Sequence, residues 1–186
     1  MEDFTKENAQ LDKTDVVTIY FYSGLRVEKT YSVGSYAAWV STENFRISLS
    51  GRFEQPPTDK CDCIIKSIIN ALRILKKEYN KPFKLAILYT PWVDYSINHA
   101  IKCVVRNKRI PRTVHNDAGQ SLMKELDCFS KIRLKENSYH FDNEIRKNSE
   151  YIINYLRNKT NKYLLEKGTE IELFDRKKKE IVYTLS

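Results

Sequence analysis

Residues 56–75 read PPTDKCDCIIKSIINALRIL, a stretch that ends one kind of structure and begins another. Pro56 and Pro57 stop a strand-rich region, because proline cannot donate to a sheet ladder. Thr58 and Asp59 are side chains that cap helix N-termini. Apolar residues then recur at helical spacing, at Ile64, Ile65, Ile68, Ile69, Leu72 and Leu75. The stretch therefore predicts a long helix with one continuous apolar face.

Strand-like runs lie on both sides of this helix. Before it, residues 16–22, 35–41 and 46–50 are rich in β-branched and aromatic residues and predict three strands in a meander. After it, Asn80 to Pro82 end the helix and residues 84–89 predict a fourth strand. A helix that connects two strands of one sheet implies parallel pairing and a right-handed crossover.

The second half of the chain continues this alternation. A helix is expected over 97–105, a short helix capped by Asp117, a strand over 131–134 and a long helix over 144–161. The inward side chains expected on the long helix are Ile145, Tyr151, Ile152, Tyr155 and Leu156. The element order is βββαβααβα. After Gly168, residues 169–186 are typical of a hairpin that turns at 176–179, although four cations make an unfavourable tight turn.

Composition limits the classes of protein. A chain of 186 residues with 41% hydrophobic content predicts one compact domain, and the formal charge of +8 favours polyanionic partners. The four cysteines form no metal-binding pattern, no run is long enough to cross a membrane, and the N-terminus is polar and acidic. We therefore expect an intracellular protein, cytoplasmic or nuclear, with reduced thiols and no membrane contact. The boundaries expected are a flexible arm over 1–14, a domain over 15–165 and the hairpin extension over 166–186.

One segment concentrates positive charge. Residues 106–112 read RNKRIPR and hold four cations within seven residues. Cations grouped in this way contact nucleic-acid phosphates, although they also occur on solvated loops. The candidate phosphate-binding residues are Lys102, Arg106, Lys108, Arg109 and Arg112.

From about residue 16 to residue 155 the chain resembles ribonuclease HI, the domain that also occurs in reverse transcriptases. The segments SYAAWV and RISLSGRF are similar to the family's second and third strands, and PPTDKCDC is similar to its threonine-asparagine lead-in. The basic RNKRIPR before VHNDAGQSLMKEL resembles the family's basic protrusion and its following helix. The resemblance implies an α/β, ribonuclease H-like fold with a mixed five-stranded sheet and helices on both faces. It is also compatible with a viral or retroelement origin.

The family's chemistry depends on acidic residues that this chain lacks at most of the expected positions. Members use a cluster of Asp and Glu to hold two divalent metal ions that activate water and stabilise the leaving oxygen. Residues 20–23 replace the first acid, Thr90 and Pro91 the third, and Lys147 or Ser149 the fourth. Asp62 alone is an acceptable match, at the second position. The resemblance therefore implies a catalytically silent domain without metal or other cofactor.

A divergent active site is the competing interpretation. It would assemble Asp62, Asp94, Asp142 and Glu150 from neighbouring turns, with His140 resembling the mobile histidine of the family's last loop, and it would need Mg²⁺ or Mn²⁺. Simpler roles exist for two of these acids: Asp62 suits the first turn of a helix, and Asp94 suits a helix N-cap.

Aromatic residues suggest a further possibility. Trp39 is expected in the core, whereas Tyr22 and Trp92 are expected at strand ends beside the former metal site. There their rings could stack on bases or close a protein interface.

Three hypotheses follow. The leading one is a silent ribonuclease H-like domain that binds RNA/DNA hybrid or double-stranded RNA through its basic loop. The second is a protein-interaction or homodimerisation module on the same fold. The third is a divergent metal-dependent ribonuclease H.

Overall fold

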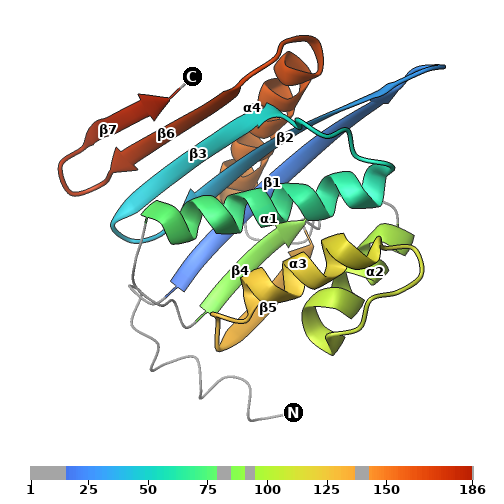
Figure 1. Cartoon of the computed structure of the whole chain (residues 1–186). Coiled ribbons are helices and arrows are strands. Elements are labelled where there is room, and N and C mark those ends of the chain that lie inside the picture. The colour runs from blue at the N-terminus through green and yellow to red at the C-terminus, as the bar shows by residue number, and fades with distance from the viewer. Residues whose placement is uncertain (1–15, 79–84, 91–94, 137–142, 186) are drawn as a thin grey trace.

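The computed structural model describes residues 16–78, 85–90, 95–136 and 143–185. These residues form one mixed sheet with the strand order β5-β4-β1-β2-β3-β6-β7. Helices cover both of its faces (Figure 1). The expected 1–14 arm lies outside the described residues, and the domain boundaries predicted from sequence stay predictions.

The centre of the sheet is a meander followed by a parallel crossover. Strands β1 (Val16–Val27), β2 (Ser32–Ser41) and β3 (Phe45–Arg52) pair antiparallel in sequence. Strand β4 (Leu85–Thr90) returns parallel to β1, and β5 (Lys131–Glu136) pairs parallel to β4. The predicted element order and the parallel crossover are therefore confirmed.

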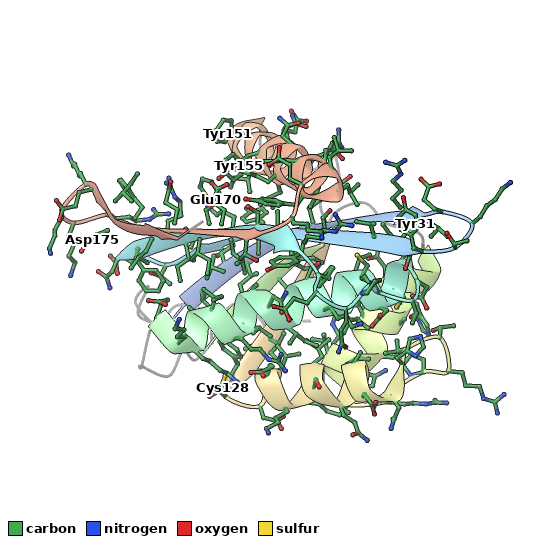
Figure 2. The ribbon with its side chains drawn as sticks, turned by 45° about the horizontal axis from the view of Figure 1, so that its top comes forward. Tyr31, Cys128, Tyr151, Tyr155, Glu170 and Asp175 are labelled. Atoms are coloured by element: carbon green, nitrogen blue, oxygen red, sulfur yellow. The ribbon has the colours of Figure 1, made fainter. Side chains whose placement is uncertain are left out.

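The helices divide into two layers. Helix α1 (Lys60–Glu78) packs on β1 and β2 and is joined by α3 (Asn116–Leu126), while α2 (Tyr95–Asn107) contacts α3, α1 and β5. Helix α4 (Asn143–Leu165) packs against β1, β2 and β3. Figure 2 shows α4 above the sheet and α1 and α3 below it. The predicted fold class, with helices on both faces, is confirmed.

The main core lies between α1 and the sheet. The apolar positions predicted for this helix are all buried, with Ile65, Ile68 and Leu72 at 0% exposure. They meet inward side chains of the central strands, among them Ile19 and Val40. Apolar side chains with the helical period of α1 thus pack against side chains with the two-residue period of the strands.

The C-terminal hairpin belongs to the same sheet. Strand β6 (Thr169–Asp175) pairs antiparallel with β3, and β7 (Glu180–Leu185) pairs with β6 and forms the edge. The turn lies at 176–179, as predicted. Asp175 permits it, because its Oδ1 accepts the N–H groups of Lys177 and Lys178 at 2.8 and 3.1 Å, and Lys179 adopts a φ of 58°. The five predicted strands thus gain two more beside β3.

Three local predictions need correction. Strand β1 continues to Val27 rather than ending at Tyr22, because β2 begins earlier and the ladder extends to Val27 and Ser32. Tyr151 points away from the core and is 66% exposed. Asp117 is not the cap of α3: it lies inside the first turn, and the N-cap position is His115.

Candidate nucleic-acid interface

The basic segment follows α2 and is held by backbone structure. Lys108 adopts a left-handed conformation with a φ of 51°, and the N–H of Arg109 bonds back to the carbonyl of Cys103 at 3.2 Å. A left-handed residue followed by such a bond is a common way to end a helix. The chain therefore leaves α2 in a defined direction.

Apolar contacts fix the other end of this basic loop, residues 106–112. A Cβ on Gly119 of α3 would come within 2.9 Å of the side chain of Ile110, so Ile110 packs closely on that helix. Val114 is buried, and its N–H donates to the carbonyl of Pro111 at 3.0 Å. With the Arg109 N–H bonded to Cys103 at one end and Ile110 and Val114 anchored at the other, the loop that carries the cations has a fixed backbone.

The five predicted phosphate-binding residues do not share one environment. Lys108 forms an ion pair with Asp127 at 3.0 Å, and Lys102 is half-buried on α2 with an interaction of its own. The arginines are exposed and form no ion pair with any described residue; they are Arg106, Arg109 and Arg112. Unpaired arginines have their fork of N–H donors available for phosphate oxygens.

The loop leads into a contact that the sequence did not predict. His115 follows the buried Val114, and its Nε2 lies 2.7 Å from the hydroxyl of Thr58, which precedes α1. The carboxylate of Asp59 lies 3.6 Å from the same nitrogen. Thr58 stands in the quoted lead-in segment, but no signal in the sequence connects it with a residue 57 positions later. The structure thus brings together the N-termini of α1 and α3 beside the basic loop.

A cavity of about 700 Å³ extends from this contact along α1. Its apolar side is formed by sheet residues such as Leu49 and Ile171, and its polar side includes Lys66 of α1 and Asp117 of α3. A space of this size with mixed walls can take part of a ligand. Thr58 and His115 line the cavity, so it adjoins the basic loop.

Asp62 does not fit the role of a metal ligand as it is placed. The residue is 3% exposed, and its Oδ2 accepts the backbone N–H of Thr58 at 3.0 Å and lies 2.8 Å from the ammonium of Lys66. In return, the N–H of Asp62 donates to the carboxylate of Asp59 at 2.9 Å. This exchange is similar to a capping box, in which the third helical residue bonds back toward the cap. The helix-terminal role therefore accounts for the carboxylate.

The other catalytic candidates are not assembled by the described structure. Glu150 is exposed on α4, while Asp94, His140 and Asp142 lie outside the described residues. Within the described ranges, no group of three or more His, Cys, Asp or Glu side chains could hold a metal ion.

The aromatic residues expected near the positions of the family's acids have structural partners. Tyr22 lies under α4, with the guanidinium of Arg157 5.8 Å from its ring centroid. Trp39 is half-buried rather than part of the core, and its ring meets that of Tyr155 edge-on at 5.4 Å. Trp92, expected beside Tyr22, lies outside the described residues.

No helix in the described part of the chain is long and apolar enough to cross a membrane. No protein-family model matches the sequence. No curated protein matches it significantly either.

Solved structures, in contrast, resemble the fold. The ribonuclease H1 of the archaeon Halobacterium salinarum NRC-1 superposes with a TM-score of 0.51 at 9% identity, over 80% of this chain and 97% of the other. LC11-RNase H1, isolated from compost by a metagenomic approach, superposes with a TM-score of 0.49 at 10% identity, over 81% of this chain and 99% of the other. The N-terminal RNase H domain of a Mycobacterium tuberculosis protein superposes with a TM-score of 0.44 at 13% identity, over 80% of this chain and 94% of the other. Because the archaeal enzyme is covered almost entirely, the chain has a ribonuclease H-like fold.

Proposed function

We propose that this chain is a ribonuclease H-like protein that binds the backbone of a nucleic-acid duplex, RNA/DNA hybrid or double-stranded RNA, and does not cleave it. The observation that carries the proposal is the set of three exposed arginines on the anchored loop, Arg106, Arg109 and Arg112. Lys102 and Lys108 lie in the same region, although Lys108 is paired with Asp127.

The physical case for phosphate binding rests on charge and order. An arginine without an acidic partner has no ion pair to break before it meets a phosphate, and an ordered loop loses little conformational entropy on binding. Thr58 and His115, at the end of the loop, are hydrogen-bonded to each other, and whichever of the two accepts that bond keeps an O–H or N–H that can donate to a neighbouring phosphate oxygen. Together they favour recognition of the backbone rather than of base sequence.

The case for silence rests on the carboxylates. The chain has no acid within residues 20–23, and Asp62 is already bonded to Thr58 and Lys66. Releasing Asp62 for a metal ion would leave the α1 terminus without its reciprocal bond. The proposal therefore assigns Asp62 to helix capping and assigns no step to a metal.

The binding test compares a loop variant with a matched surface variant. Replacing Arg106, Arg109 and Arg112 by Ser should weaken binding to a labelled hybrid or RNA duplex, and the slope of log affinity against log salt should fall by roughly one per lost phosphate contact. The measurement is fluorescence anisotropy at several salt concentrations. Replacing the exposed Lys29, Lys77 and Lys167 by Ser removes equal charge elsewhere and should change the slope much less.

Equal slopes for the two triple variants, or no duplex binding at low salt, would reject the loop as the interface. Salt-insensitive self-association would instead support the alternative of a protein-interaction module.

Silence is tested separately, with labelled hybrid in Mg²⁺ and in Mn²⁺. We expect no metal-dependent cleavage by the wild type. Cleavage that disappears in Asp62→Asn would overturn the silent assignment and support the divergent nuclease, whether or not the loop binds duplex.

A further inference from the structure

A second surface lies on the α4 face of the sheet, away from the basic loop. We call it the aromatic–arginine face; it consists of Trp39, Arg46, Tyr151, Tyr155 and Phe174. Three of these come from the neighbouring strands β2, β3 and β6, where Arg46 stands opposite Phe174 in the ladder. The two tyrosines come from the helix that covers this side of the sheet. None of these residues belongs to the interface proposed above.

The centre of this face is a stack across three strands. The guanidinium of Arg46 lies 4.5 Å from the ring centroid of Trp39 on one side and 4.7 Å from that of Phe174 on the other. One of its N–H groups donates to Glu172 at 2.9 Å, whereas its Nε is buried and has no hydrogen-bond partner in the described part of the chain. The two rings and the Glu172 carboxylate together therefore hold Arg46 in place.

The tyrosines extend the face toward solvent. Tyr155 meets Trp39 edge-on, and its hydroxyl lies 2.8 Å from that of Ser48. Tyr151, one helical turn earlier, is 66% exposed. Figure 2 shows both tyrosines on the side of α4 nearer Asp175, the last residue of β6 before the turn, and no helix lies over the sheet between them and Asp175. Ile181 of β7, opposite Phe174, is also 53% exposed.

Positive charge borders the uncovered area. The β6–β7 turn carries four consecutive exposed cations, Arg176, Lys177, Lys178 and Lys179, and Arg176 bonds to Ser41 at the end of β2. The acids on these two strands near the turn are Glu172, Asp175 and Glu180; Glu172 is paired with Arg46, and Glu180 lies 3.9 Å from the ammonium of Lys178. The area therefore combines the exposed ring of Tyr151 and the half-buried rings around it with an excess of cations.

We propose that the aromatic–arginine face binds single-stranded nucleic acid, with a base stacking on the exposed ring of Tyr151, its neighbours meeting the half-buried rings beside it, and phosphates lying beside the cationic turn. Base–aromatic stacking next to a positive track is the usual chemistry of single-strand binding without sequence preference. Tyr, Trp and Arg are also enriched in protein interfaces, but the cationic border favours a polyanion over a neutral protein surface. This inference does not depend on duplex binding by the basic loop.

The test uses a fluorescein-labelled oligouridine RNA of about ten nucleotides, within the range of single-strand site sizes. Tyr151→Ala should weaken its affinity roughly fivefold or more, because one stacking ring is lost. Tyr151→Phe keeps the ring and should bind like the wild type. Tyr31→Ala removes a tyrosine that is 57% exposed in the β1–β2 hairpin, far from this face in Figure 2, and should have no effect.

A second measurement removes the dependence on one variant. In a Trp92→Phe chain the remaining tryptophan is Trp39, and we expect oligouridine to quench its fluorescence with the affinity seen by anisotropy. The basic-loop triple variant should retain this quenching, so failure of the duplex proposal can be told apart from failure of this one.

Three results would overturn the inference: no binding at low salt, equal affinities for Tyr151→Ala and Tyr31→Ala, or equal losses for Tyr151→Ala and Tyr151→Phe. Self-association of the wild type that Tyr151→Ala abolishes would instead assign the face to a second copy of the chain.

Discussion

Asp62, at the N-terminus of α1, has a different role from the one that its position in the sequence suggests. Asp62 occupies the place where the ribonuclease H resemblance expects an acid, yet its carboxylate is 2% exposed and bonded to Thr58 and Lys66. A buried carboxylate needs such partners, because an unpaired buried charge is strongly destabilising. The sequence could indicate both roles, and only the side-chain geometry favours capping.

The cysteines give a prediction at the same scale. Burial raises the pKa of Cys61 to about 11 and that of Cys63 to about 12, with the negative charges of Asp59 and Asp62 adding to the shift. Cys103 is buried as well, whereas Cys128 is exposed. Because the thiolate is the reactive form, we expect one fast-reacting thiol per native chain. A disulfide exchange reagent with a coloured product measures this near pH 8.

Cys128→Ser should remove the fast phase, and denaturant should release all remaining thiols. Two or more fast thiols in the native protein would contradict the buried positions of Cys61, Cys63 and Cys103.

Between elements, α4 and β6 are joined by a polar cluster. Glu170 of β6 accepts from Lys159 at 2.5 Å and from the hydroxyl of Tyr163 at 3.1 Å. Burial alone would raise the pKa of Glu170, but these hydrogen bonds and the charges of Lys159 and Lys162 lower it below its usual value of 4.5. The carboxylate thus stabilises the contact between the helix and the hairpin.

This cluster predicts an acid-dependent loss of stability. A carboxyl group whose folded-state pKa is lowered contributes fully above its unfolded pKa and loses that contribution as the pH falls through the folded value. At neutral pH, Glu170→Gln should lower the free energy of unfolding by about 1 kcal/mol. Thermal unfolding of both proteins should converge as the pH drops below 4.5. A constant difference down to strongly acidic pH would exclude the ionised carboxylate as the cause.

The period of α4 explains why one predicted inward residue failed. Among its side chains from Glu150 onward, the buried ones are Leu156, Thr160 and Tyr163, which share a helical stripe. Tyr151 precedes Leu156 by five positions and therefore lies about 140° around the helix from it. The aromatic and aliphatic residues of this helix are compatible with more than one apolar face. Only packing on the sheet decides which face is buried.

For the whole molecule, the hairpin decides where the sheet ends. Ile171 and Leu173 of β6 pack against the core, and β6 pairs along β3. A chain that stops after Gly168 would expose the β3 edge and should lose several kcal/mol, lowering the melting temperature by on the order of 10 °C. Circular dichroism melts measure this. A chain that stops after Asp175 keeps β6 and should lose much less.

Equal melting temperatures for the chain that stops after Gly168 and the wild type would show that 15–165 is stable without its hairpin. A large loss confined to the shorter chain would show that the hairpin is integral to the domain.

The sequence by itself determined the features that depend on neighbouring residues. The α1 helix with its cap, the strand meander, the parallel crossover and the 176–179 turn all follow from local spacing, because hydrophobic period and turn chemistry act over a few residues. Only the tertiary structure decided which distant surfaces meet. Two such contacts are Thr58 beside His115 and Arg46 between Trp39 and Phe174. Each joins separate segments, and the local pattern of one segment does not predict the position of the other. Both candidate binding surfaces depend on such meetings, since packing of the whole chain, rather than local propensity, sets the distances between them.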